Sequence, residues 1–288
     1  MYVYELGDVD APALLYLHGG PGMGCHNFVQ WQGQTLARGV RLVTFDQRGF
    51  HQSDALGPDE PLSEDIIVED CEALREALGI ASWFVIGHSY GGRLATRYAA
   101  RYPASVRGVI FENPSWDVAS TRRFRLPVVA TLFERHGRPE EAQACRDDAA
   151  STELFADDPM RTELLGRLGP LGERWFLHPD SDRGLLDHEL VERLHDEADD
   201  RAAELLFQSP LLLENLTALL AGLTVPSRLV LGEADLVTAP DQVAIFEAAF
   251  GADRVVRVAG AGHVIQGEQP AVYAELVLDL VDAMAQQR

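Results

Sequence analysis

The chain has 288 residues, of which 47% are hydrophobic and 24% are charged, and its formal net charge is −21. This length is sufficient for one large α/β domain, or for a core domain with an insertion. The charge disfavours nucleic acid as a partner, because no basic stripe is present to displace counterions from phosphate. All 24 basic residues are arginine, which excludes a lysine base, a lysine Schiff base and a Ser–Lys hydrolase mechanism.

The three cysteines, Cys25, Cys71 and Cys145, are scattered without CxxC spacing. They predict neither a disulfide framework nor a zinc site, and they favour a reducing compartment. The first residues lack the basic start and apolar run of a signal peptide, and no run of about eighteen apolar residues occurs. We therefore expect a cytoplasmic location and no membrane partner; the oligomeric state is not predicted.

Six short apolar runs predict buried β-strands, each ending in a loop rich in Gly, Asp, Asn or His. In chain order they are 13–20, 41–49, 82–89, 106–113, 227–235 and 253–263. Helix-period segments separate several of them, such as 63–79, with Ser63 as its N-cap, and 93–103, which stops at Pro103. This alternation predicts an α/β fold whose mostly parallel sheet is covered by helices on both faces and binds ligands at the carboxyl ends of its strands.

The region 114–223 interrupts this alternation. It contains charged, helix-period segments with Pro and Gly breaks and no convincing strand. We therefore predict a core domain of residues 1–113 and 224–288 with a helical cap over 114–223. Such a cap would overhang a site at the carboxyl edge of the sheet; a solvated helical domain of structural use is the alternative. The stretch 188–195, HELVERLH, has histidines seven residues apart rather than the four of a zinc motif, so no metal is expected.

The stretch 87–92, GHSYGG, places Ser89 between a predicted strand and a predicted helix. G-x-S-x-G in that position is typical of a nucleophile elbow, a strained turn that lifts the serine hydroxyl clear of the sheet. The glycines fit because a side chain there would collide with the neighbouring strand or helix. A neighbour on such an elbow points away from the nucleophile, so we expect His88 to pack rather than to react.

A serine hydroxyl needs a base to take its proton, and a third group must orient that base. In nucleophile-elbow proteins these groups follow in the order Ser, Asp or Glu, His. Asp235 ends the apolar run 227–235, and His263 follows the last predicted strand. The sequence therefore predicts a triad of Ser89, Asp235 and His263, with Glu233 and Glu112 as alternatives for the acid.

Acyl transfer also needs hydrogen-bond donors for the oxyanion formed at the attacked carbonyl. One donor is predicted to be the backbone N–H of Tyr90, directly after the nucleophile, and the other should come from a loop after an early strand. The stretch 18–22, HGGPG, is that loop. We expect the second donor to be the Gly20 N–H, with the Gly19 N–H as the alternative.

Five motifs in this order resemble those of α/β-hydrolases of the proline iminopeptidase group: HGGPG at 18–22, DQRG at 46–49, GHSYGG at 87–92, GEADLVT at 232–238 and GAGH at 260–263. The resemblance covers about 1–113 and 224–288, and it departs from the family at His51, where glycine is common. It implies an α/β-hydrolase fold, no metal or organic cofactor, and release of an N-terminal proline or small apolar residue from a peptide through an acyl-enzyme.

The resemblance also implies that cap glutamates hold the free ammonium of the substrate. Glu214, beside Asn215, is similar to a family Glu-Asn pair, and Glu204 is a second candidate; solvated surface charges are the alternative interpretation. An apolar pocket could be walled by Trp116, Phe124, Phe133, Trp175, Phe176 and Phe207.

Two other functions stay open. A carboxylesterase, lactonase or other amidase would use the same triad, and a cap without a carboxylate near the site would favour it. The alternative that is not an enzyme is a non-catalytic ligand-binding protein on a hydrolase scaffold. The intact Ser, Asp and His disfavour it. In each case the partner is a small molecule or a short peptide.

Overall fold

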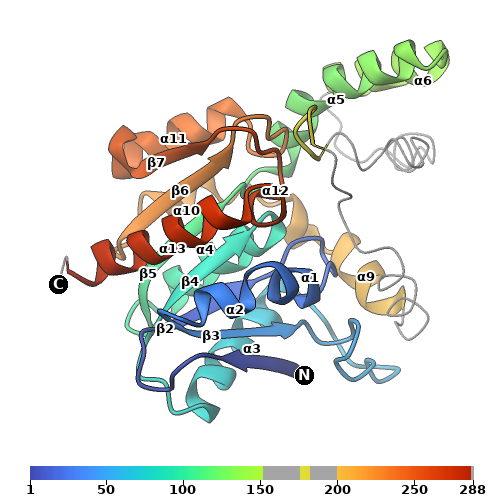
Figure 1. The fold of residues 1–288 in the computed structure, drawn as a ribbon. Coiled ribbons are helices and arrows are strands. Elements are labelled where there is room, and N and C mark those ends of the chain that lie inside the picture. Colours follow the sequence, from blue (N-terminus) through green and yellow to red (C-terminus); the bar gives the residue numbers. More distant parts are fainter. Residues whose placement is uncertain (152–175, 182–199, 287–288) are drawn as a thin grey trace.

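The computed structural model describes residues 1–151, 176–181 and 200–286, which fold around one seven-stranded sheet (Figure 1). The strands lie in the order β1-β3-β2-β4-β5-β6-β7 across the sheet. Their bounds are Tyr2–Leu6 (β1), Ala13–Leu17 (β2), Arg41–Asp46 (β3), Trp83–His88 (β4), Val106–Glu112 (β5), Ser227–Gly232 (β6) and Val255–Val258 (β7). Every neighbouring pair is parallel except β1 with β3, so the predicted α/β fold class is confirmed.

Each of the six predicted runs contains one of the strands β2 to β7. The strand β1 was not predicted, because its five residues are exposed or half-buried and lack the apolar run of a buried strand. It lies at the edge of the sheet, where a strand has a neighbour on one side only.

Helices cover both faces of the sheet because successive strand side chains point to opposite faces. Val85 and Leu229 belong to a hydrophobic cluster with α3, α4 and α11, whereas Phe84 and Val230 pack on the other face with α1, α2, α12 and α13 (Figure 1). The bounds are His26–Phe28 (α1), Gln34–Leu36 (α2), Glu64–Ala77 (α3), Tyr90–Arg101 (α4), Pro240–Phe250 (α11), Ile265–Glu268 (α12) and Pro270–Ala285 (α13), with a π-helical turn Val29–Gly33 and a 3-10 turn Ala252–Arg254. Ser63 caps α3 by accepting the Ile66 N–H at 3.3 Å.

The elements described between β5 and β6 are all helical. They are α5 (Val118–Arg135), α6 (Pro139–Ala150), α9 (Asp200–Phe207), a 3-10 turn Pro210–Leu213 and α10 (Thr217–Leu220). The helices α5 and α6 pack on each other through Leu126, Phe133 and Cys145. The division into a core and a cap stays a prediction, and the stretch 188–195 lies outside the described residues.

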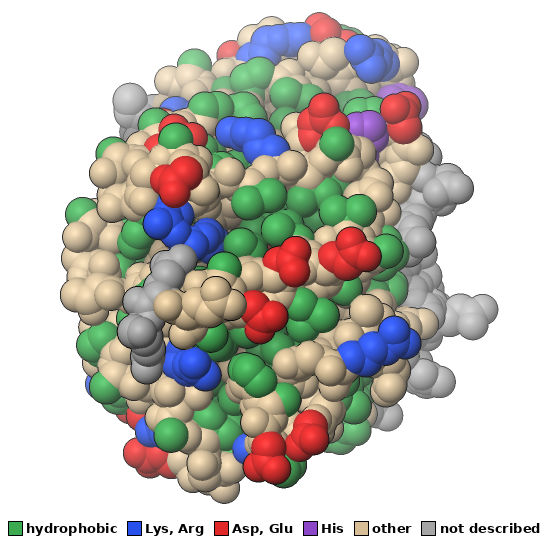
Figure 2. Space-filling model, turned by 60° about the vertical axis from the view of Figure 1, so that its left-hand side comes forward, with side chains coloured by type: hydrophobic (Ala, Val, Ile, Leu, Met, Phe, Trp, Pro, Cys, Tyr) green, Lys and Arg blue, Asp and Glu red, His purple; other side chains and the backbone are tan. Residues whose placement is uncertain are grey.

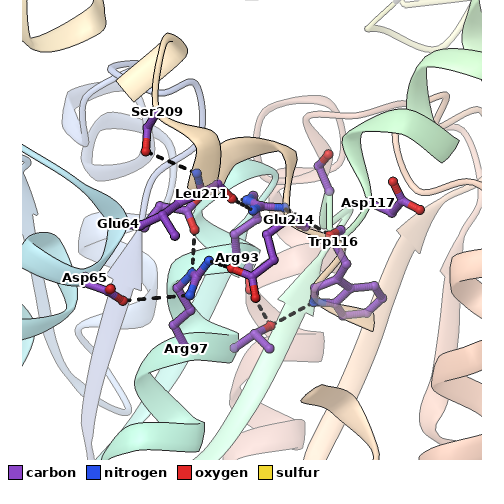
Figure 3. A network of polar contacts seen from close by, with 12 residues as sticks. Glu64, Asp65, Arg93, Arg97, Trp116, Asp117, Ser209, Leu211 and Glu214 are labelled. Carbon is purple, nitrogen blue, oxygen red and sulfur yellow. Dashed lines mark hydrogen bonds and ion pairs between the residues drawn. The ribbon is translucent and has the colours of Figure 1, made fainter. Parts of the chain in front are cut away.

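A buried arginine joins the two ends of the predicted cap to helix α4 (Figure 3). The guanidinium of Arg93 donates hydrogen bonds to the carbonyl oxygens of Trp116 at 3.0 Å, Glu214 at 3.1 Å and Leu211 at 2.5 Å. Trp116 lies close to the start of the region 114–223, and the other two residues lie close to its end. Arg93 therefore binds both ends of the region 114–223 to the helix that follows Ser89.

The surface carries its charge in dispersed form on the face shown in Figure 2. Acidic and basic side chains alternate with hydrophobic ones there, and neither sign gathers into one large patch. Within the described residues, no helix has both the length and the apolar composition needed to cross a bilayer.

Candidate active site

Ser89 occupies a strained turn between β4 and α4. Its φ of 54° and ψ of −118° lie in a region that side-chain-bearing residues rarely adopt. Its N–H donates to the Glu112 carbonyl at 3.0 Å, and its side chain is at a half-exposed position. A methyl group on Gly91 would lie 2.1 Å from the Leu17 carbonyl oxygen, and one on Gly87 would lie 2.5 Å from that of Gly91. Glycine is therefore required on both sides of the serine.

His263 and Asp235 form a buried pair in the loops that follow the paired strands β7 and β6. His263 Nδ1 lies 2.7 Å from Asp235 Oδ1, and each side chain is 3% exposed. Because a carboxylate only accepts, Nδ1 carries the proton and Nε2 is left as the basic nitrogen. The second oxygen of Asp235 accepts the Thr238 N–H at 2.8 Å, whereas the exposed Glu233 accepts the Gly260 N–H at 3.0 Å. Of the candidate acids, Asp235 is the one bonded to the histidine.

The imidazole of His263 lies between two other rings. Its centroid is 4.8 Å from that of His88, the residue before Ser89, and 5.3 Å from that of Phe176. No hydrogen bond joins Ser89 Oγ to His263 among the described contacts. Such catalytic bonds are often long in a free enzyme and tighten when substrate binds, so this geometry is compatible with proton transfer between the two groups.

The predicted oxyanion donors lie on two segments that meet at Ser89. A methyl group on Gly19 would lie 2.9 Å from Ser89 Cβ, so the loop after β2 touches Ser89. Gly20 has a φ of 115° and is exposed, and Tyr90 is the first residue of α4. Neither the Gly20 N–H nor the Tyr90 N–H donates to another group within residues 1–151, 176–181 and 200–286. Both N–H groups therefore stay candidates for the donors to an oxyanion at Ser89.

Asn113, which was not singled out from the sequence, ties together the loops that carry the acid and the base. Its side-chain amide donates to the carbonyl oxygens of Gly262 at 3.1 Å and His263 at 2.8 Å. Its amide oxygen accepts the Gly232 N–H at 2.9 Å. Its φ of 41° is in the left-handed region, which asparagine tolerates better than most residues. That preference was the only signal in the sequence.

Glu112, the other alternative acid, lies in a fully buried polar group behind the pair. One of its oxygens accepts the Tyr273 hydroxyl at 2.8 Å, and the other is 3.6 Å from His88 Nδ1. Burial, with a smaller contribution from the charge of Asp235, raises the pKa of Glu112 to about 8. Burial also lowers the pKa of His88 well below its ordinary value. Both groups are therefore neutral at pH 7, so that no unpaired charge is buried at this place.

The two cap glutamates have different surroundings. The carboxylate of Glu214 is ion-paired with Arg97 at 2.6 Å, and its side chain is 50% exposed. Arg97 follows Ser89 by eight positions, about 12 Å along the axis of α4, so the structure does not bring the Glu214 carboxylate to Ser89. Glu204 is exposed on α9, two residues after the buried Ala202, whose methyl group packs against Gly49 in the loop after β3. Residues two apart on a helix point to different sides, so the Glu204 carboxylate does not share this contact. Among the described residues this carboxylate has no ion-pair or hydrogen-bond partner.

The aromatic side chains considered as pocket walls are divided between core and surface. Trp116 is fully buried and stacks on Phe246, and Phe133 is buried between α5 and α6. Phe124 is half-buried and Phe207 is 58% exposed. Phe176 is the one that contacts the His263 ring, and Trp175 lies outside the described residues. No group of three or more potential metal ligands occurs in the described part of the chain.

Comparisons with known proteins identify the family of the chain. The family described as alpha/beta hydrolase fold matches residues 12–270. A proline iminopeptidase of Neisseria gonorrhoeae is 36% identical over 113 residues, which cover 39% of this chain and 36% of the relative. Epoxide hydrolase 3 of Xenopus tropicalis is 35% identical over 109 residues, which cover 37% of this chain and 29% of the relative.

The chain therefore matches about a third of the length of each of these curated relatives. Among solved structures, a proline iminopeptidase-related protein from Thermus thermophilus superposes with a TM-score of 0.73 at 25% identity, covering 98% of this chain and 93% of that one. Because the family match extends over most of the sequence, the chain belongs to the alpha/beta hydrolase fold family.

Proposed function

We propose that the protein is a serine hydrolase that works through an acyl-enzyme. The observation that carries the proposal is the 2.7 Å bond between His263 and Asp235, next to a serine held on a strained elbow. His263 Nε2 would take the proton of the Ser89 hydroxyl as its oxygen attacks the substrate carbonyl. Asp235 keeps Nδ1 protonated and stabilises the imidazolium that forms.

The negative charge that develops on the carbonyl oxygen would be met by the N–H groups of Gly20 and Tyr90. His263 then gives its proton to the leaving amine or alkoxide, and the acyl group remains on Ser89. Water enters, His263 removes its proton, and attack on the ester releases the acid and restores the serine. No step calls for a metal or an organic cofactor.

For the substrate, we propose a short peptide with a free N-terminal proline or small apolar residue. The support is the iminopeptidase relatives, together with an exposed carboxylate at Glu204 on α9 that has no ion-pair partner among the described residues. A carboxylate held near the nucleophile would fix the ammonium of an unblocked substrate. Glu214 is not included, because Arg97 already neutralises it. The protein would then act in the cytoplasm on small molecules, without nucleic acid or membrane.

An ester, lactone or other amide substrate is the second candidate, because the match to an epoxide hydrolase extends the family resemblance beyond peptidases. The test compares proline anilide, alanine anilide, N-blocked proline anilide and a short-chain nitrophenyl ester, with Ser89→Ala as the control. Turnover of the free but not of the blocked anilide supports the peptidase. Turnover of the ester alone retains the mechanism and rejects the peptidase assignment.

The serine mechanism itself is tested with a fluorophosphonate probe. We expect covalent labelling of the wild type at Ser89 and none of Ser89→Ala. An unlabelled wild type that turns over no substrate would favour a binding protein on this scaffold.

A further inference from the structure

His51 lies in the loop after β3 and contacts the glycine-rich loop after β2. Its Nε2 is 2.7 Å from the carbonyl oxygen of Gly22. A carbonyl oxygen only accepts, so Nε2 carries the proton and donates. The imidazole therefore links the loop at 46–53 to the loop at 18–24, which contains the proposed oxyanion donor Gly20.

The backbone of His51 is in an unfavourable conformation for a residue with a large side chain. Its φ of 49° lies in the left-handed region, which glycine adopts without cost and which a histidine adopts only against steric resistance. Its Nδ1 is buried and has no hydrogen-bond partner in the described part of the chain. The contacts of the ring must offset both costs, and the hydrogen bond to the Gly22 carbonyl is its one polar contact among the described residues.

The glycine loop is shaped to receive the ring. A methyl group on Gly24 would lie 2.5 Å from His51 Cδ2, and one on Gly22 would lie 2.4 Å from Phe50 Cε1. His51 and its neighbour Phe50 thus cover the backbone of the glycine loop at close range. Only a loop without side chains at these two positions permits this packing.

The position of Gly22 is transmitted to Gly20 through a closed turn. The Met23 N–H donates to the Gly19 carbonyl at 3.1 Å. A methyl group on Gly20 would lie 2.5 Å from the Gly22 nitrogen and 2.8 Å from that of Met23, so the turn has no free space. Because Gly20 and Gly22 belong to this one hydrogen-bonded turn, we expect a shift of Gly22 to move the Gly20 N–H relative to Ser89, which Gly19 touches.

We propose that His51 is a positioning residue that holds the Gly22 carbonyl and thereby aims the Gly20 N–H at the oxyanion. The proposal rests on the serine-hydrolase function above. It assigns His51 no contact with substrate and no proton transfer. Loss of the Nε2 bond would leave ground-state binding intact and weaken the binding of the tetrahedral state, because an oxyanion donor acts only where charge develops.

The experiment uses His51→Gly, which relaxes the left-handed backbone and removes only the ring. His51→Gln retains a donor able to reach Gly22, and Gln52→Ala removes an exposed side chain from the same loop as the matched control. For each, kcat and KM are measured on the best substrate. Affinities are also measured for the product acid and for a boronic acid with the same acyl side chain, which forms a tetrahedral adduct on serine.

For His51→Gly we expect kcat to fall about 10- to 100-fold with KM within about twofold, and the boronic acid to bind more weakly by a similar factor. The product acid should bind as to the wild type. His51→Gln should recover most of the loss, and Gln52→Ala should resemble the wild type.

Wild-type kcat and boronic acid affinity in His51→Gly would overturn the inference. So would an equal weakening of product and boronic acid, which would indicate a purely structural role. If His51→Gly does not fold, the same comparison between His51→Gln and His51→Asn decides, because the shorter amide of asparagine tolerates the backbone but does not reach Gly22. Failure of the wild type to react with the fluorophosphonate would instead reject the proposed function, and this inference with it.

Discussion

Arg93 Nε donates to Glu64 Oε1 at 2.7 Å, and the two side chains are 0% and 1% exposed. The second oxygen of Glu64 accepts from Arg97 at 2.5 Å, and Arg97 in turn pairs with Glu214 (Figure 3). The helices α3 and α4 and the end of the predicted cap are therefore joined by one chain of ion pairs.

We expect Arg93→Met to lower the free energy of unfolding by about 3 kcal/mol, because it leaves a buried carboxylate less neutralised and removes one donor from each of three carbonyl oxygens. The Trp116 and Leu211 carbonyl oxygens still accept the N–H groups of Leu216 and Glu214, whereas that of Glu214 has no other donor among the described residues. Urea denaturation measures this. Arg101→Met is the control on the same helix: Arg101 and its partner Glu69 are about half exposed, so its loss should cost less than about 1 kcal/mol. Equal effects in the two variants would contradict the structural role of the buried pair.

Asp235→Asn and Glu233→Gln distinguish the two acids that lie two residues apart. An amide at 235 can donate to Nδ1, which favours the tautomer with the proton on Nε2 and abolishes the base. We expect kcat to fall on the order of 10³- to 10⁴-fold for Asp235→Asn. The kcat of Glu233→Gln should stay within about threefold of the wild type, because the Glu233 carboxylate accepts the Gly260 N–H and does not contact His263. The reverse order would reassign the acid.

Asn113→Gly tests the clamp, by which we mean the three hydrogen bonds that join the Asn113 side chain to Gly232, Gly262 and His263. Glycine adopts the φ of 41° freely, so the variant removes the hydrogen bonds without straining the backbone. We expect kcat to fall at least about tenfold and the free energy of unfolding to fall by about 1 to 3 kcal/mol. Kinetics and urea denaturation of the same preparation measure both, and unchanged kcat with lower stability would show that the clamp serves the fold alone.

Glu112 should make stability depend on pH. Its pKa is raised from 4.5 to about 8 by burial, so between these values the unfolded chain has released a proton that the folded chain keeps. The contribution of the protonated Glu112 carboxyl to the free energy of unfolding is complete below pH 4.5. It is lost as the pH rises from 4.5 through about 8, by at most about 1.4 kcal/mol per pH unit.

Glu112→Gln keeps an acceptor for Tyr273 and removes this titration. Relative to the wild type, we expect its free energy of unfolding to increase steadily from pH 5 to pH 8 in urea denaturation. The exposed Glu275→Gln serves as the control and should keep a constant difference. A constant difference for Glu112→Gln as well would show that this carboxyl is not protonated in the folded protein.

Glu204→Gln and Glu214→Gln test which of the two carboxylates binds the free N-terminal ammonium of the substrate. We expect Glu204→Gln to raise KM for the free proline anilide at least about tenfold and to leave the nitrophenyl ester unaffected, because only the amine carries a charge. Glu214→Gln should leave both substrates unchanged, since its carboxylate binds Arg97. Loss of anilide turnover in Glu214→Gln alone would reverse the assignment.

Local features of the sequence were sufficient for the fold class. Apolar runs between helix-period segments predict buried parallel strands wherever they occur in the chain, and each of the six runs contains a strand. The cap of α3 at Ser63 follows from one side chain bonding to a nearby N–H. The edge strand β1 could not be predicted in this way, because its one-sided burial leaves no continuous apolar run.

The sequence by itself determined which residue types stand at the strand ends, and therefore the candidates Ser89, Asp235 and His263. Only the tertiary structure decided which carboxylate meets the histidine, because Asp235 and Glu233 have similar local sequence but their loop aims them at different partners. It also decided that Asn113 bonds to His263 across a separation of 150 residues. Such contacts depend on how distant segments pack, and the energies of packing are not recorded in any local pattern of residues.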